Sequence, residues 1–147
     1  MTQAVDITVE RVIRADRHDV AAFAADMGNA PKWYRNIASV EWETAPSTAT
    51  GARAAFVAHY MSRKLAYTYE VREHLPGERL VMSTDNGPFP METIYDWSDA
   101  GRGRTRMRLT NRGRPEGFKA LLMPLLSIAM RRAMTQDLAQ LDKVLRR

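Results

Sequence analysis

The segment "YEVREHLPGERLVMSTDNGP" (residues 69–88) contains two strand-like runs joined by a tight turn. Pro76-Gly77 separates the two runs, and Asn86-Gly87 follows the second. Pro-Gly and Asn-Gly pairs favour the backbone angles of short turns between antiparallel strands. The pattern continues in both directions and predicts six strands, at residues 37–45, 52–61, 65–75, 78–85, 91–99 and 104–112. Loops of hairpin length separate these runs, so we expect an antiparallel meander.

Different segments precede and follow the meander. Residues 5–14 carry β-branched residues at every second position and predict a further strand. Asp16 is placed to cap a helix over about residues 17–27, and Asn29-Ala30-Pro31 starts a short second helical turn. A long helix is expected from about residue 116 to 145, with Pro124 either kinking it or marking where it becomes regular. One face of this helix carries an apolar stripe, formed by Met130, Met134, Leu138, Leu141 and Leu145.

This order of elements predicts an α+β fold in one domain, residues 1–147. A curved seven-stranded antiparallel sheet has one apolar face that needs a cover, and only the C-terminal helix is long enough to supply it. Two short helices lie between the first and second strands. A strongly bent sheet around a single helix leaves space between the two, so the topology predicts an internal cavity.

Composition excludes several classes of site. The chain has no cysteine, so disulfides, thiolate metal sites and cysteine nucleophiles are ruled out. Its three histidines, His18, His59 and His74, show no metal-ligand spacing, and we expect neither a metal nor a cofactor. We see no secretory signal at the start, and the apolar stretch at residues 120–130 is too short to span a bilayer. We therefore expect a cytoplasmic protein with no stable membrane insertion.

The net charge of +5 raises the question of an acidic partner. Arginines at positions 102, 104, 106 and 108 alternate with other residues and therefore share one face of a strand. A solvated sheet face is the simpler interpretation, with Glu92 and Asp96 of the preceding strand able to pair across with these arginines. The alternative is a basic surface that binds nucleic acid, which would weaken steeply with salt. We expect no nucleic-acid partner.

Several segments, taken in order, resemble the helix-grip superfamily of START and birch-pollen-allergen-like proteins (SRPBCC). The segments are "VIRADRHDVAAFAADMGNAPKWYRNI" (12–37), "TATGARAAF" (48–56), the hairpin at 69–88, "GRGRTRMRL" (101–109) and "LAQLDKVLRR" (138–147). Within this superfamily the sequence is most similar to the bacterial polyketide cyclase/dehydrase and lipid-transport family. The resemblance implies a helix-grip fold. It leaves the activity open, because such folds host transporters, sensors, cyclases and hydrolases.

Alternation assigns residues to the face that looks toward the helix. Tyr67 and Tyr69 share a face opposite Glu70 and Arg72, so the tyrosines point inward. Residues 52–61 are ambiguous, with a slight preference for Phe56, Ala58 and Tyr60 inside. The expected ligand-binding surface is rich in aromatic residues and methionine: Trp33, Phe56, Tyr60, Tyr67, Tyr69, Met82, Tyr95, Trp97, Met107, Met123 and Met130. The same residues could form an ordinary filled core, although several inward tyrosine hydroxyls favour a wet or ligand-filled space.

Catalytic residues are harder to identify. His59, Tyr60 and Tyr69 are candidates for a general acid or base, because histidine titrates near neutral pH and a buried tyrosine can donate a proton. His74 is a further histidine of this kind, but its place beside the Pro76-Gly77 turn favours exposure. The resemblance implies that cyclase relatives act largely through cavity shape, which is catalysis by proximity and leaves little motif to find. Whether the protein is an enzyme stays undecided.

Trp33 and Tyr34 stand side by side in the short second helix. Trp33 occupies the position of the family's tryptophan, and the resemblance implies a structural plug that packs inward at the end of the cavity. Tyr34 would be rotated by about 100° from Trp33 in a helix, which places it toward the rim or solvent.

Three functions remain in competition. The first is binding or transport of a hydrophobic small molecule, such as a lipid, polyketide or quinone, in the internal cavity. The second is a polyketide cyclase, aromatase or dehydratase that uses the same cavity, and a buried pair of titratable groups would favour it. The third is a basic interaction module. A monomer or a homodimer is compatible with all three.

Overall fold

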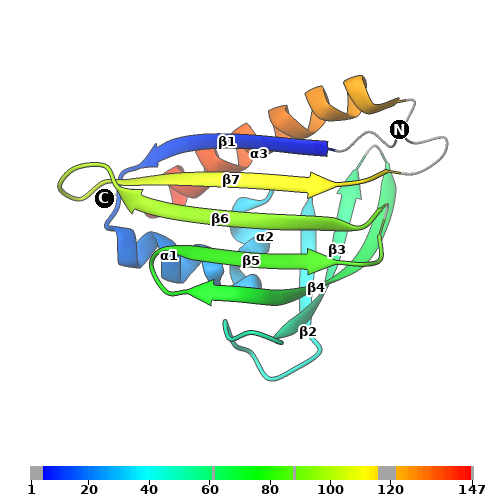
Figure 1. The fold of residues 1–147 in the computed structure, drawn as a ribbon, viewed down its shortest axis with the longest axis horizontal. Coiled ribbons are helices and arrows are strands. Elements are labelled where there is room, and N and C mark those ends of the chain that lie inside the picture. Colours follow the sequence, from blue (N-terminus) through cyan, green and yellow to red (C-terminus); the bar gives the residue numbers. More distant parts are fainter. Residues whose placement is uncertain (1–4, 61, 88, 116–121, 147) are drawn as a thin grey trace.

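The computed structural model describes residues 5–60, 62–87, 89–115 and 122–146, without the side chains of Tyr60 and Met123. Within these residues, seven strands form one sheet and three α-helices cover part of it (Figure 1). The chain order is β1 (Val5–Ile13), α1 (Arg17–Ala25), the 3-10 helix η1 (Met27–Asn29), α2 (Ala30–Trp33), β2 (Ile37–Trp42), β3 (Arg53–Tyr60), β4 (Arg63–Leu75), β5 (Arg79–Thr84), β6 (Met91–Asp99), β7 (Thr105–Gly113) and α3 (Met123–Leu145).

The sheet confirms the predicted meander. Its strand order is β1-β7-β6-β5-β4-β3-β2, and every neighbouring pair is antiparallel. The first strand joins the free edge of the meander by pairing with β7. Register shifts between Ile37 and Ser39 and between Val71 and Glu73 mark bulges, which bend the sheet. The helix-grip fold expected from the sequence is therefore the fold that the chain adopts.

The helices cover one face and one end of the sheet. In Figure 1, the later part of α3 runs behind the sheet and its first part extends past the edge at β1, while α1 and α2 lie together toward one end of the strands. Asp16 caps α1 as predicted, by accepting a hydrogen bond from the backbone N–H of His18 at 3.2 Å. Pro124 lies in the first turn of α3, so it marks the start of the helix and does not kink it. The expected earlier part of this helix, residues 116–121, lies outside the described residues.

The C-terminal half of α3 is held to the start of the chain. Leu138 and Leu141 are fully buried, as the predicted apolar stripe requires. Asp142 follows them and is only 2 % exposed. Its carboxylate accepts hydrogen bonds from the guanidinium groups of Arg11 and Arg14 and from the backbone N–H of Arg14. Burial alone would raise the pKa of Asp142, but these hydrogen bonds and the Arg14 charge lower it.

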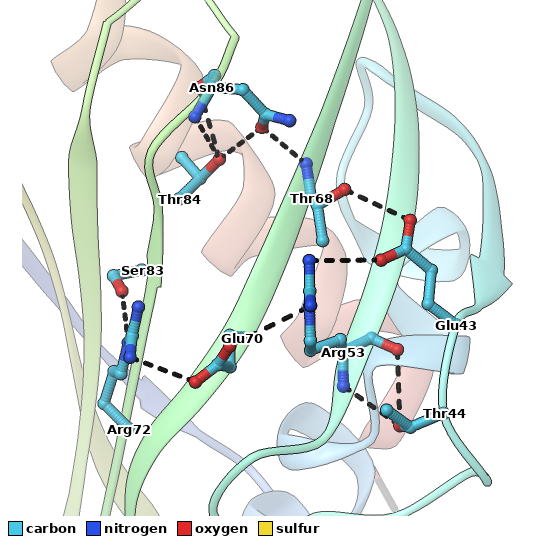
Figure 2. Close-up of polar contacts among 9 residues, drawn as sticks. All are labelled: Glu43, Thr44, Arg53, Thr68, Glu70, Arg72, Ser83, Thr84 and Asn86. Carbon is cyan, nitrogen blue, oxygen red and sulfur yellow. Dashed lines mark hydrogen bonds and ion pairs between the residues drawn. The ribbon is translucent and has the colours of Figure 1, made fainter.

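The outer face of the sheet is polar, as the alternation in β4 predicts. Figure 2 shows Glu70 of β4 in contact with both Arg53 and Arg72. The same figure shows that the side-chain oxygen of Asn86 accepts a hydrogen bond from the backbone N–H of Thr68 at 2.8 Å. Asn86 belongs to the β5–β6 connection, so this bond holds that connection against β4. The inward neighbours of Thr68, Tyr67 and Tyr69, point to the opposite face.

The arginines of β7 form ion pairs, but with a different strand from the one expected. Arg106 and Arg108 both contact Glu10 of β1, with Arg108 at 2.9 Å. Asp96 instead pairs with Arg79 of β5 at 2.8 Å. The register of the strands explains the difference. Arg108 of β7 lies directly between Glu10 of β1 and Asp96 of β6, and Asp96 already pairs with Arg79 on the neighbouring strand β5. In the described residues, no helix is long and apolar enough to cross a membrane.

Candidate ligand-binding cavity

A cavity of about 770 Å³ lies between the sheet and the first half of α3. This volume falls within the range of about 300–1,000 Å³ that is typical of small-molecule sites. Most of the wall is apolar. The sheet contributes Phe56, Ala58, Leu65, Tyr67, Tyr69, Met82 and Met91, and the helix contributes Leu126, Ala129, Met130, Ala133 and Met134.

The cavity is open on one side and closed on the other. Arg63 is exposed and Leu65 and Leu126 are partly exposed, so the open side lies near the starts of β4 and α3. Tyr69 and Met134 are buried in the wall farther along the same two elements. Beyond them, toward the end that α1 and α2 cover, core side chains fill the space between sheet and helix. The space between the two layers is thus hollow over only part of its length.

Five of the eleven predicted ligand-binding residues lie on the cavity wall: Phe56, Tyr67, Tyr69, Met82 and Met130. The rings of Phe56, Tyr67 and Tyr69 form one aromatic cluster, with centroids 5.4–5.8 Å apart. The inward face preferred for β3 agrees with the structure, because Phe56 is 3 % and Ala58 6 % exposed. Alternation therefore identified the correct face on both β3 and β4.

Four of the predicted residues lie in the packed core and not in the wall: Trp33, Tyr95, Trp97 and Met107. Their side chains are 0–5 % exposed. Tyr95 and Trp97 are on the correct face of β6, but on the half of the strand where α1, α2 and the end of α3 fill the space. Alternation assigns a face and carries no information about position along the strand. The side chains of the last two predicted residues, Tyr60 and Met123, lie outside the described residues.

The helical rotation left the cavity rim and solvent open for Tyr34, and the structure excludes solvent, because the partly exposed side chain lines the cavity. Tyr34 is the residue that ends α2, with an extended backbone (φ −81°, ψ 120°), so a helical rotation does not apply to it. Its ring lies beside Trp33, with centroids 4.1 Å apart. Trp33 itself is 1 % exposed and packs inward, as the plug interpretation requires.

The catalytic candidates separate into two groups. His59 is exposed, because the inward position of Phe56 and Ala58 directs it to the outer face of β3, and it is therefore not a cavity residue. Tyr69 lines the cavity, and its hydroxyl lies 3.0 Å from the hydroxyl of Thr93. In the described residues, no group of three or more histidine, aspartate or glutamate side chains is arranged to hold a metal ion.

Two hydrogen-bonded polar groups face the apolar cavity. In the first, Thr93 donates to the side-chain oxygen of Asn111 at 2.7 Å, so the hydroxyl of Tyr69 must be the donor to Thr93. In the second, the hydroxyls of Tyr34 and Tyr95 bond to each other at 2.5 Å. Burial is the main cause that raises the pKa of Tyr34, Tyr69 and Tyr95, so these hydroxyls keep their protons near neutral pH.

Asp137 of α3 is the carboxylate in the cavity wall. It is 5 % exposed, and its Oδ1 accepts a hydrogen bond from the backbone N–H of Arg35 at 3.1 Å. Its Oδ2 receives no hydrogen bond from any described residue. Burial raises the pKa of Asp137 to about 6, although the Arg35 hydrogen bond and the Arg35 charge lower it in part. The negative charge in turn raises the pKa of Tyr34, Tyr67 and Tyr95.

Asp137 and Asn111 were not among the predicted site residues, although the sequence carries signals for both. Asp137 follows Met130 by seven positions and Met134 by three, so it lies on the same face of the helix. Asn111 follows Leu109 by two positions, so the alternation in β7 already placed it inside. A polar residue that continues an apolar face indicates a site more specifically than the apolar residues around it.

Comparison with known proteins agrees with this geometry. The sequence profile of a family described as "Polyketide cyclase / dehydrase and lipid transport" matches residues 4–146. No curated protein sequence matches the chain at a significant level.

Solved structures with low sequence identity have the same fold. The Zhui aromatase/cyclase from Streptomyces sp. R1128 superposes with a TM-score of 0.82 and 12 % identity, over 97 % of this chain and 94 % of that one. The protein TTHA0849 from Thermus thermophilus has a TM-score of 0.80 and 22 % identity, over 94 % of each chain. A START superfamily protein from Mycobacterium smegmatis has a TM-score of 0.78 and 9 % identity, over 95 % of this chain and 96 % of that one. At these identities the likeness concerns the fold.

Proposed function

This chain belongs to the polyketide cyclase/dehydrase and lipid-transport family, and from that premise we propose that it binds and carries a hydrophobic small molecule between the sheet and α3. The observation that carries the proposal is the cavity of about 770 Å³ with its largely apolar wall. An apolar guest in this cavity would be removed from water, which is the main source of affinity in such sites.

The composition of the wall also supports this function. Met82, Met91, Met130 and Met134 line the cavity from both layers. Methionine side chains are unbranched and flexible, so they adapt to guests of different shape. The open side near Arg63 offers a route for entry. Native mass spectrometry of freshly purified protein, with extraction of bound lipids, should identify a co-purified guest.

A cavity-filling variant tests the location of the guest. Ala58 and Ala133 face the cavity from β3 and α3, so tryptophan at both positions adds bulk from opposite walls. We expect Ala58→Trp/Ala133→Trp to weaken binding of the neutral dye Nile red by at least roughly tenfold, because the tryptophans occupy the space of the guest. Fluorescence titration measures this affinity.

The matched control is Ala66→Trp. Ala66 is an exposed alanine on β4, between the inward residues Leu65 and Tyr67, so tryptophan there points away from the cavity. This variant should bind Nile red as the wild type does. Equal affinity in the wild type and the cavity-filling variant, with both folded by circular dichroism, would contradict the proposed site.

Acid–base catalysis on a polyketide-like guest is a second function, which one observation favours. Asp137 reaches the cavity with a pKa of about 6, close to the value that suits a general base near neutral pH. Tyr34 and Tyr95 supply neutral hydroxyls nearby. Incubation with a poly-β-ketone probe, followed by mass spectrometry, tests this function. Conversion by the wild type and not by Asp137→Asn would support it, and an unchanged probe with the wild type would remove it.

The basic interaction module receives less support. Two of the four arginines that suggested it, Arg106 and Arg108, are engaged with Glu10 of β1. The other two, Arg102 and Arg104, precede β7 and are exposed, so the four do not share one strand face as predicted. An arginine already paired with a carboxylate offers less net charge to a phosphate group.

A further inference from the structure

The cavity wall carries few charged side chains, and they differ in their exposure to water. Among the described wall residues, Arg63 and Asp137 carry a formal charge. Arg63 is exposed at the start of β4, where water screens it. Asp137 is 5 % exposed and belongs to the wall on α3. The buried charge that a guest meets is therefore negative.

The remaining polar groups of the wall are neutral. The hydroxyl of Tyr67 has no hydrogen-bond partner among the described residues. Tyr34 and Tyr95 have one hydroxyl proton each, and one of these protons forms the hydrogen bond between the two residues. The other O–H is therefore free to donate. Asn111 accepts from Thr93 through its oxygen, so its NH₂ group has capacity left. The cavity thus offers hydrogen-bond donors suited to a ketone, hydroxyl or phenol oxygen.

The geometry of Asp137 adds an acceptor to these donors. Its Oδ1 is occupied by the N–H of Arg35, while its Oδ2 receives no hydrogen bond from a described residue. A hydroxyl group of a guest can donate to Oδ2 and accept from a tyrosine at the same time. A carboxylate has no proton to donate and would place a second negative charge beside Asp137. In a site of low dielectric constant such like-charge contacts are strongly unfavourable.

We propose that the cavity selects neutral, oxygen-bearing apolar molecules, such as long-chain alcohols, ketones or phenols, over carboxylates, and that Asp137 sets this selectivity. This inference rests on the proposed binding function. It specifies the chemistry of the guest: an apolar body with a neutral polar group that reaches Asp137 and the tyrosine hydroxyls. A free fatty acid would have to place its carboxylate near Asp137 or leave the buried polar groups against its hydrocarbon chain, and both arrangements are unfavourable.

The test compares two ligands that differ only in the polar group, decan-1-ol and decanoate, by calorimetric titration at pH 8. We expect the wild type to bind decan-1-ol at least roughly tenfold more tightly than decanoate. The Asp137→Asn variant removes the charge and, with its oxygen on the N–H of Arg35, places an NH₂ group in the position of Oδ2. The loss of like-charge repulsion should strengthen binding of decanoate, so this variant should reduce the ratio by about tenfold. Asp137→Ser provides a second neutral variant with the same expected result.

Two controls isolate the effect of Asp137. Asp142→Asn removes a carboxylate from the same helix at a position that faces Arg11 and Arg14, so it should leave the ratio unchanged. Arg63→Gln removes the cation at the open side and tests whether decanoate binds there.

The possible failures are distinguishable. Equal or tighter binding of decanoate by the wild type, or a ratio that neither Asp137 variant changes, would overturn this inference alone. Failure of the wild type to bind either ligand would overturn the proposed function together with it.

Discussion

Replacement of Trp33 by alanine should lower the free energy of unfolding by about 3–5 kcal/mol, the usual cost of removing a buried tryptophan. Trp33 is 1 % exposed and ranks among the largest fully buried side chains. Its ring contacts Tyr34 at 4.1 Å and Tyr95 at 5.6 Å between centroids. Alanine would leave a void between α2 and β6, and the Tyr34–Tyr95 hydrogen bond would lose its support. Urea unfolding followed by circular dichroism measures the change.

Trp33→Phe is the matched control for this prediction. Phenylalanine keeps an aromatic ring at the site, and it removes the indole Nε1, which is buried without a hydrogen-bond partner among the described residues. Since an unpaired buried donor costs stability, its removal offsets part of the lost packing. We expect a loss of less than half that of the alanine variant. A loss below about 1 kcal/mol for Trp33→Ala would contradict the role of Trp33 as the plug at this end.

Replacement of Asp137 by asparagine should stabilise the protein above pH 6. The pKa of Asp137 rises from its ordinary value of 3.8 to about 6 on folding, so the folded state binds a proton more tightly than the unfolded state. Stability therefore falls as the pH rises from about 4 to 6, and above pH 6 the ionised carboxylate costs up to about 3 kcal/mol. Asparagine carries no charge and retains an oxygen that can accept from Arg35.

The pH profile distinguishes this effect from a general change in packing. Asp137→Asn should be more stable than the wild type at pH 7.5 and similar to it at pH 4, as measured by urea unfolding at both values. The residue that acts on the pKa of Asp137 is Arg35, which favours the ionised form. The neighbouring Tyr34, Tyr67 and Tyr95, whose pKa values are raised, stay neutral in this range. A variant that is less stable than the wild type at pH 7.5 would show that Asp137 is not a destabilising charge.

Asp142→Asn is the control with the opposite sign. Hydrogen bonds from Arg14 and Arg11 hold the pKa of Asp142 below its ordinary value despite burial. The ionised Asp142 carboxylate therefore stabilises the folded state at pH values above the pKa that it has in the unfolded chain. This contribution is lost as the pH falls through the lower pKa that it has in the folded state. Asp142→Asn should therefore destabilise the protein at pH 7.5, where Asp137→Asn stabilises it. The two carboxylates lie on one helix, so the contrast arises from their surroundings.

The contrast also has a functional meaning. Asp142 secures α3 to β1, whereas Asp137 lowers the stability of the unliganded protein and faces the cavity. A buried charge that costs stability is typical of residues that serve binding or catalysis. The same helix thus combines a structural carboxylate over the filled part of the interior with a candidate functional one over the hollow part.

Much of the fold could be predicted from the sequence, because it follows from local patterns. The alternation in β6 gave its bounds, Met91–Asp99, as the structure has them. Pro76-Gly77 and Asn86-Gly87 marked the turns on either side of β5, and the polar face of β4 identified Tyr67 and Tyr69 as inward residues. Each of these features depends on neighbours within a few positions along the chain.

The extent of the cavity could not be predicted in this way. Tyr69 and Trp97 both occupy inward positions, yet Tyr69 lines the cavity and Trp97 belongs to the core. Their difference depends on where α1, α2 and the end of α3 fill the interior, which is a property of the assembled fold. The choice between rim and solvent stayed open for Tyr34 because the rotation assumed a helical backbone, whereas Tyr34 follows the helix with an extended backbone. The partner of Arg108 was missed because β1, distant in sequence, lies beside β7.

The methyl groups of the methionines report directly whether a guest lies between the sheet and α3. Met82, Met91, Met130 and Met134 line the cavity, whereas Met27 and Met107 are buried in the core outside its wall. With ¹³C-methyl-labelled methionine and decan-1-ol as the guest, NMR should show intermolecular nuclear Overhauser effects to the first four methyl groups and none to the other two. Effects at Met27 and Met107, or the absence of effects at all four wall methionines with saturating decan-1-ol, would contradict a binding site between the sheet and α3.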